Sequence, residues 1–167
     1  MCSSDLHADL RDTFMGTPHN HACAMRRVVE HAPVTQVGIR SLCQEEAMAV
    51  PSLPTTIFYD FNMRDDPAWM DRVVDSLGEK VYLTIDVDGL DPAIMPATGT
   101  PEPGGLSWRE LLTLLRKVIA AKTVVGCDLV ELSPMPGNVA PTFLCAKLIY
   151  KILSYRFGAE IRQRHAR

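Results

Sequence analysis

The fold is decided by the stretch Thr84-Ile-Asp86-Val-Asp88-Gly-Leu-Asp91-Pro, which lies near the middle of this 167-residue chain. An apolar run over residues 81–85 leads into two carboxylates spaced i and i+2. Side chains alternate along a strand with a period of two, so Asp86 and Asp88 would project on the same side of the strand end. Two such carboxylates repel each other and lose hydration unless a cation lies between them. The stretch therefore predicts a buried strand that ends in a metal site.

A second cluster of ligand-type side chains stands at the start of the chain, in Asp5-Leu-His7-Ala-Asp9. The sequence shows no strand before it, although a cluster of this kind is expected to follow one. Residues 1–6, Met1-Cys-Ser-Ser-Asp-Leu6, look like the translated end of a sequencing-library adapter. We therefore expect these six residues to be non-native, with Asp5 a coincidental match, and residues 1–167 to be the C-terminal part of one larger domain. Loss of the N-terminal strands would expose the edge of a strand such as 81–86, or of one preceding His7.

Strands and helices alternate along the rest of the chain. β-branched, aromatic and other apolar runs predict strands at 35–40, 55–59, 81–86 and 124–132. Apolar residues at helical spacing predict helices at 19–30, 42–50, 66–77, 108–121 and 138–155. Ser107 and Glu110 have the spacing of a capping box before the fourth helix. The alternation favours an α/β fold with a parallel sheet, in which ligands collect at the carboxyl ends of the strands.

Composition excludes several classes of function. Hydrophobic residues make up 47% of the chain and the formal net charge is −3, and no basic patch interleaved with aromatic residues indicates nucleic-acid binding. Five scattered cysteines without a Cys-x-x-Cys pair argue against a disulfide framework, so we expect a reducing, cytoplasmic location. No apolar run approaches the roughly 20 residues that span a bilayer, so we expect no membrane association.

Three longer motifs accompany the two clusters: His19-Asn-His21-Ala-Cys-Ala-Met-Arg26-Arg27, Pro96-Ala-Thr-Gly-Thr100-Pro-Glu-Pro-Gly-Gly105-Leu and Asp128-Leu-Val-Glu131-Leu-Ser-Pro134. Together with the clusters, these motifs resemble the ureohydrolase family of arginases and agmatinases, and the Thr-Pro-Glu-Pro-Gly-Gly form is closer to agmatinases. The resemblance extends over nearly the whole chain from His7 onward. It implies an arginase-like, three-layer α/β/α fold with a mainly parallel sheet, of which this chain is the C-terminal part of a single ureohydrolase domain.

The resemblance also implies a centre of two Mn²⁺ ions that hydrolyses a guanidino group to urea and an amine. The family's ligands fall here on Asp5, His7, Asp9, Asp86 and Asp88. Carboxylates suit Mn²⁺, and an imidazole adds a ligand that Mg²⁺ rarely takes. Two ions about 3.5–4 Å apart can share a water and lower its pKa toward neutrality. A further histidine ligand of the family, upstream of the first cluster in a Gly-Gly-x-His-type motif, has no counterpart in this chain.

By the same resemblance, Glu131 binds the substrate guanidinium and acts in catalysis, His21 carries a proton to the leaving amine, and Thr100 belongs to the substrate site. The first choice of reaction is hydrolysis of agmatine to putrescine and urea. Another amidinohydrolase, such as a guanidinobutyrase or an arginase-like enzyme, stays open, as does a truncated remnant without activity. We expect the full-length enzyme to be a homo-oligomer.

Plainer interpretations of these residues compete with the functional ones. A lone Asp-x-Asp at a strand end is usually solvated, and an EF-hand is excluded because Gly89 lies at the wrong position of the loop. Asp91 fits a loop organiser better than a ligand. A buried strand around Glu131 would require a cationic partner, supplied by the substrate or by an arginine of the protein. Cys23 suggests a thiol hydrolase, but a residue two positions from His21 on a helix faces elsewhere.

Overall fold

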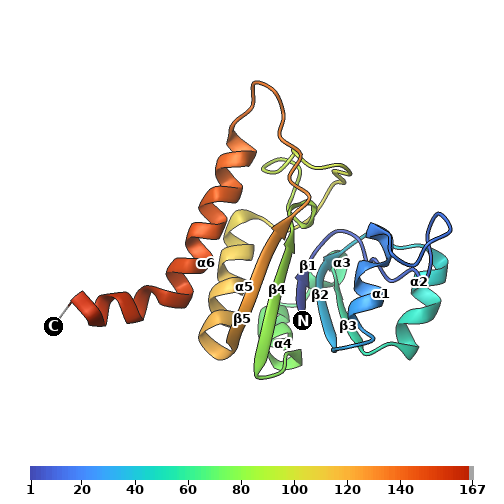
Figure 1. Cartoon of the computed structure of the whole chain (residues 1–167), viewed down its shortest axis with the longest axis horizontal. Coiled ribbons are helices and arrows are strands. Elements are labelled where there is room, and N and C mark those ends of the chain that lie inside the picture. Colours follow the sequence, from blue (N-terminus) through green and yellow to red (C-terminus); the bar gives the residue numbers. More distant parts are fainter. Residues whose placement is uncertain (166–167) are drawn as a thin grey trace.

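Five parallel strands form the sheet that organises the chain. The computed structural model describes residues 1–165. The strands are β1 (Cys2–Ser4), β2 (Val34–Ile39), β3 (Thr55–Tyr59), β4 (Lys80–Asp86) and β5 (Thr123–Val130). They lie in the order β3-β2-β1-β4-β5, and each neighbouring pair is parallel. All five carboxyl ends therefore meet at one edge of the sheet, where Figure 1 shows the connecting loops gathered.

Strand β1 corrects the expectation that no strand precedes residue 5. Cys2 to Ser4 pair with residues 35–37 of β2 on one side and with residues 83–85 of β4 on the other. All three residues are buried at the centre of the sheet. The two serines have little intrinsic preference for strands, so burial between two partners, rather than local propensity, determines this element. It also follows that β1 and β4 are central strands, and not the exposed edge that we expected them to provide.

The helices alternate with the strands largely as predicted. They are α1 (Ala24–Val28), α2 (Gln44–Ala49), α3 (Asp60–Met63), α4 (Trp69–Ser76), α5 (Trp108–Ala121) and α6 (Ala140–His165). Short 3₁₀ turns precede α1, follow α2 and follow β4; they are η1 (His21–Cys23), η2 (Val50–Ser52) and η3 (Val87–Gly89). Helix α5 and its capping box are confirmed: Ser107 Oγ accepts from Glu110 N at 3.3 Å, and Ser107 N donates to Glu110 Oε2 at 2.8 Å.

Several predicted boundaries are wrong. The helix predicted over 19–30 is shorter, because it begins as a 3₁₀ turn at His21 and gives way to turns just ahead of Pro33. The strand predicted to reach residue 132 ends at Val130, because Glu131 has a positive φ of 64° that strand geometry excludes. Helix α6 continues to His165 instead of ending near residue 155.

Helices cover both faces of the sheet, which confirms the predicted α/β class and its layers (Figure 1). One apolar cluster joins β4 to α4, α5 and α6, with Leu83, Val73, Leu115 and Leu148 among its buried members. A smaller cluster packs the α1 segment against β2 on the other side. None of the helices in the described part is both long and apolar enough to cross a membrane.

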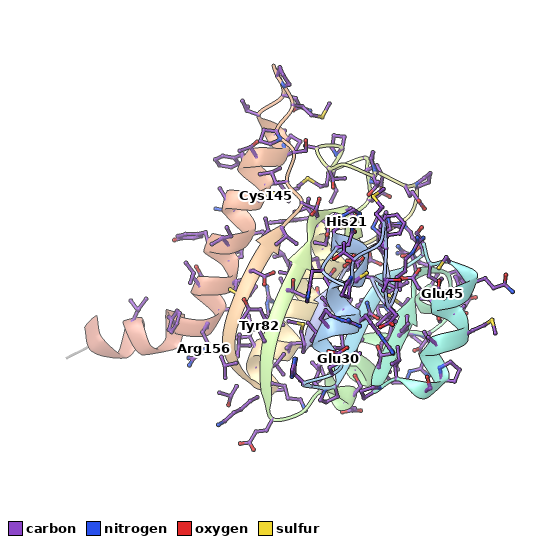
Figure 2. All side chains as sticks on the ribbon, turned by 45° about the vertical axis from the view of Figure 1, so that its right-hand side comes forward. His21, Glu30, Glu45, Tyr82, Cys145 and Arg156 are labelled. Atoms are coloured by element: carbon purple, nitrogen blue, oxygen red, sulfur yellow. The ribbon has the colours of Figure 1, made fainter. Side chains whose placement is uncertain are left out.

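Strand β5 lies at the edge of the sheet and is the least covered strand. Its burial alternates between exposed and half-buried residues, whereas β2 is buried throughout. Tyr82, which pairs with Gly126 of β5, remains 37% exposed, and Figure 2 shows it on the β4–β5 part of the sheet.

Candidate metal centre and active site

The two ligand clusters of the sequence come together at the ends of two neighbouring strands. Asp5 directly follows β1, and Asp86 is the last residue of β4. Asp5, His7 and Asp88 each offer a ligand atom within 4.8 Å of the others. Asp86 Oδ1 accepts from the backbone N of Asp88 at 2.9 Å. The parallel pairing of β1 with β4 is therefore what joins clusters that lie about eighty residues apart.

Backbone groups hold these carboxylates in place. Asp88 Oδ1 accepts from Leu6 N at 3.0 Å, and Asp5 Oδ1 accepts from His7 N at 2.8 Å. A side chain at Gly89 would place its Cβ 2.9 Å from Asp5 N, so only glycine lets the turn after β4 approach β1 so closely. These backbone hydrogen bonds fix one oxygen of Asp5 and one oxygen of Asp88.

The pKa values of most carboxyl groups in the cluster are raised, so a nearby positive charge would favour their ionised form. Burial, then the charges of Asp86, Asp9 and Asp88, raise the pKa of Asp5 well above its usual value. Burial likewise raises the pKa of Asp9 to about 7 and, with the neighbouring Asp88, that of Asp86 to about 8. These carboxylates therefore resist ionisation until a cation is close.

Asp88, which is paired with His7, is the exception among the four carboxyl groups, because its pKa is lowered. His7 Nδ1 lies 3.0 Å from Asp88 Oδ2. Burial alone would raise the pKa of Asp88, but hydrogen bonds from His7 and from Leu6 N outweigh it and lower the pKa. The same bond to Asp88 raises the pKa of His7. Asp88 is thus the one carboxylate among the four candidate ligands whose pKa is lowered.

The donor set fits the implied metal pair. The candidate ligands supply four carboxylates and one imidazole, the chemistry expected for Mn²⁺ or a similar ion. Two divalent cations would bring four positive charges, which equals the number of carboxylates. Such a pair would offset the burial and the negative charges that raise the pKa values of Asp5, Asp9 and Asp86.

A pocket of about 420 Å³ opens over this cluster. Its lining residues are His7, Asp9, Arg11, Phe14, His21, Ala22, Asp86, Asp88, Gly99, Thr100 and Glu131. Seven of the eight predicted site residues belong to this lining. The eighth, Asp5, is only 4% exposed and lies in the ligand cluster with His7 and Asp88. The structure therefore brings all the predicted site residues together.

His21 stands on the pocket wall as the first residue of η1. Asn20 caps this turn through its side-chain oxygen, which accepts from Ala22 N at 3.2 Å. The imidazole is exposed and meets the ring of Phe14 edge-on at 6.0 Å. Figure 2 shows His21 toward the loop end of the sheet and Glu30 toward the opposite end. Cys23 is fully buried and does not line the pocket, which removes the basis for a thiol hydrolase.

Glu131 corrects one premise of the sequence interpretation. We expected it within a buried strand, but it lies just beyond β5 and is exposed. Burial therefore does not force Glu131 to have a cationic partner within the protein. Its carboxylate lies close enough to Asp9 and Asp86 to add, after burial and other charges, to their raised pKa values.

The loop between η3 and α5 supplies the remaining wall. Thr100 Oγ1 donates to Asp88 Oδ2 at 3.4 Å, so Thr100 contacts a candidate ligand directly. Asp91 Oδ1 accepts from Ala93 N at 2.8 Å, which confirms that Asp91 organises the loop.

Arg11 and Phe14 also line the pocket, and the sequence interpretation did not single them out. Arg11 Cζ lies 4.5 Å from the centre of the Phe14 ring, and Arg11 Nε lies 3.8 Å from Glu46 Oε2. Glu46 is buried and accepts from the backbone N of Leu10 and of Cys43. The spacing of Cys43 and Glu46, a residue and a glutamate three positions later, is the only signal in the sequence that could have revealed this support.

Comparisons with known proteins agree with this geometry. The family model described as "Arginase family" matches residues 2–154. The chain is 48% identical over 153 residues to the N(1)-aminopropylagmatine ureohydrolase of Synechocystis sp. and covers 50% of that protein. It is 38% identical over 152 residues to the agmatinase of Pyrococcus horikoshii, of which it covers 52%. These matches use 90% and 89% of this chain.

Solved structures give the same result. The agmatine ureohydrolase of Thermoplasma volcanium superposes with a TM-score of 0.84 at 31% identity, over 95% of this chain and 56% of that one. The arginase of Medicago truncatula superposes with a TM-score of 0.78 at 27% identity. The arginase-like fold is therefore confirmed, and the chain spans about half the length of the curated relatives it matches.

Proposed function

Because the chain belongs to the arginase family, we propose that it carries the metal centre of an enzyme that hydrolyses the guanidino group of an agmatine-type amine to urea and an amine. The observation that supports this most is the convergence of Asp5, His7, Asp9, Asp86 and Asp88 below one pocket, with Glu131 on its wall.

We propose two Mn²⁺ ions as the cofactor, held by these five side chains together with any ligand that the rest of the enzyme supplies. When bound, two such ions lower the pKa of a shared water and so supply a nucleophile near neutral pH. Asp88, whose pKa is lowered by hydrogen bonds from His7 and Leu6 N, offers an ionised carboxylate to the first cation. Asp9 and Asp86 would then ionise as positive charge arrives.

Three residues of the pocket wall are assigned roles by this proposal. Glu131 accepts hydrogen bonds from the planar guanidinium, which pairs well with a carboxylate through two parallel N–H groups. His21, exposed on the wall, delivers a proton to the nitrogen of the leaving amine. Thr100 keeps Asp88 oriented through its hydroxyl group and borders the substrate.

The names of the relatives suggest the substrate class. The Synechocystis protein is named for N(1)-aminopropylagmatine and the Pyrococcus protein for agmatine, two amines that share a guanidino end. We propose one of these as substrate, which would place the enzyme in polyamine synthesis. The five cysteines, all unpaired, are consistent with a reducing compartment such as the cytoplasm.

The test is urea release by the complete gene product that carries this chain, loaded with Mn²⁺. Agmatine, N(1)-aminopropylagmatine, guanidinobutyrate and arginine are compared at equal concentration. We expect the highest kcat/KM for one of the first two. A higher kcat/KM for arginine or guanidinobutyrate would assign the enzyme a different substrate within the same family. Absence of urea with all four compounds would favour a remnant without activity.

A further inference from the structure

Arg40, the residue that follows β2, binds four backbone carbonyls with one guanidinium group. Its Nη2 donates to Asp88 O at 2.9 Å and to Glu102 O at 3.0 Å. Its Nε donates to Pro103 O at 3.2 Å and its Nη1 to Gly38 O at 3.4 Å. The side chain therefore connects the end of β2, the turn η3 and the loop before α5.

These carbonyls belong to the two segments that build the candidate metal site. Asp88 is the carboxylate with the lowered pKa, and residues 102 and 103 closely follow Thr100, whose hydroxyl donates to that carboxylate. The backbone of Arg40 closes a ring of contacts: Arg40 N donates to Leu6 O at 3.0 Å, and Leu6 N donates to Asp88 Oδ1 at 3.0 Å. Asp88 is thus tied to Arg40 both through its own carbonyl and through Leu6.

The loop is shaped to fit this guanidinium. A Cβ at Gly105 would lie 3.0 Å from Arg40 Nη2 and 2.8 Å from Gly89 O, and a Cβ at Gly104 would lie 3.5 Å from Arg40 Cδ. Gly104 has a φ of 88° and Gly105 a φ of 99°, angles that residues with side chains rarely adopt. A side chain at Gly105 would press on Arg40 Nη2 and on the backbone of Gly89 and Leu90, whereas at Gly104 the positive φ and the nearby Asp60 carboxylate, rather than Arg40, disfavour other residues.

We propose that Arg40 is a positioning residue that sets η3 and the 96–105 segment in one register, so that Asp88 and Thr100 meet at the metal site. The proposal rests on the proposed function for its effect on turnover, but its effect on metal affinity is independent of the substrate. A lysine would keep the charge but offers donors at a single atom on a flexible stem, so it cannot span carbonyls on three segments.

The experiment measures Mn²⁺ affinity, hydrogen exchange of the 96–105 amides, and kcat and KM for urea release, on the complete gene product. The variants are Arg40→Lys and Arg40→Ala. The matched control is Arg64→Lys, because Arg64 Nη2 donates to Gly105 O at 2.6 Å in the same loop, while its other partners are Asp60 and Glu110. Arg64 therefore tests general loosening of the loop without contact to Asp88.

We expect Arg40→Lys to weaken Mn²⁺ binding by about 10–100-fold, the range seen when a partner that orients a metal ligand is lost. Amide hydrogen exchange in residues 96–105 should become faster. In urea release, kcat should fall by a larger factor than KM rises. Arg64→Lys should leave Mn²⁺ affinity within about threefold of the parent value. If Arg40→Ala does not fold, Arg40→Lys decides the outcome.

Each alternative result separates this proposal from the proposed function. Wild-type Mn²⁺ affinity and exchange in Arg40→Lys would overturn the positioning role even if urea is released. An equal loss of Mn²⁺ affinity in Arg64→Lys would also overturn the positioning role of Arg40, because any contact that stabilises the loop would then have the same effect on metal binding. Weakened Mn²⁺ binding in Arg40→Lys alone would uphold it even if none of the guanidino compounds gives urea.

Discussion

Four carboxylates and one imidazole lie together at the ends of β1 and β4. The contacts that hold each side chain determine how much Mn²⁺ affinity its removal should cost. Asp86 and Asp88 are both nearly buried, and the backbone orients them. We predict that Asp86→Ala and Asp88→Ala lower Mn²⁺ affinity by more than the roughly 10–100-fold caused by losing an outer hydrogen-bond partner. Metal content after dialysis and urea release measure this effect. Asp75→Asn, at an exposed position of α4, is the control. Full metal content in Asp88→Ala would remove Asp88 from the ligand set.

Glu131 lines the pocket without belonging to the ligand cluster, so its charge should matter for substrate more than for metal. Glu131→Gln keeps the shape and removes the charge. Charge-assisted hydrogen bonds contribute about 1.5–3 kcal/mol, so we predict a loss of about 10–150-fold in kcat/KM with unchanged Mn²⁺ content. Glu45→Gln, on the exposed side of α2, should match the parent enzyme. Loss of metal with normal turnover of the remaining loaded enzyme would instead make Glu131 a ligand.

The raised pKa values predict how pH acts on the protein when a chelator removes metal. Asp9, with a pKa of about 7, and Asp86, with a pKa of about 8, bind protons in the folded state well above the ordinary carboxyl pKa of about 3.9. The folded state then holds more protons than the unfolded state, so stability falls as pH rises toward 8. The raised pKa of His7 acts in the same direction. The lowered pKa of Asp88 acts oppositely, but only below the ordinary carboxyl range.

Thermal unfolding with chelator should therefore give a lower Tm at pH 8 than at pH 5. Added Mn²⁺ should reverse the loss at pH 8, because it binds the ionised carboxylates. An equal or higher Tm at pH 8 without metal would show that burial and neighbouring charges do not raise the pKa values of Asp9 and Asp86 in the folded protein.

Among the secondary-structure elements, α5 lies beside the site without entering it, and its cap offers a test of stability alone. Ser107→Ala removes the hydroxyl that accepts from Glu110 N. Loss of such a cap costs about 1 kcal/mol, which should lower the Tm of the complete gene product by at most about 2–4 °C. We predict this shift with unchanged Mn²⁺ affinity. A change in affinity would mean that α5 positions the loop that precedes it.

The elements that could be predicted from the sequence are those whose signals are local. Ser107 and Glu110 predict the start of α5, and the alternation around Asp86 predicts the end of β4. Strand β1 could not be predicted in this way, because three small residues become a strand only when two neighbours enclose them. The exposure of Glu131 was missed for a related reason, since a single positive φ ends β5 within an apolar run.

Of the candidate site, the carboxylates Asp86 and Asp88 were predictable from the strand that precedes them, whereas the ligand role of the first cluster and the roles of the other site residues came from the resemblance to the ureohydrolase family. The residues that hold the candidate ligands in place could not be predicted, because they act through long-range contacts. Arg40 reaches carbonyls more than forty residues away, and Gly89 permits an approach to Asp5 that no local pattern specifies.

The β5 edge of the sheet and the outer surface of α6 are the poorly covered parts of the molecule. β5 lies at the sheet edge, and large apolar side chains are exposed on it and on α6, among them Val125, Phe143, Tyr150 and Leu153. Exposed strand edges and apolar patches of this kind promote association. We predict that residues 1–167, expressed alone, are insoluble or self-associate and release no urea from agmatine.

Size-exclusion chromatography with light scattering measures this association. Phe143→Glu combined with Tyr150→Glu should reduce it, whereas Glu45→Gln should not. A monomeric, cooperatively melting chain that releases urea from agmatine would contradict the prediction.

We propose that side chains from two strand ends form one centre of two metal ions that hydrolyses a guanidino group. The most direct test follows urea release from agmatine and N(1)-aminopropylagmatine by the complete gene product while the number of bound Mn²⁺ ions per chain is raised from zero to saturation. We predict saturation at two ions per chain, and urea release that reaches its maximum only when the second ion binds. Full urea release with one bound ion or none, or two bound ions without urea from either amine, would contradict the claim.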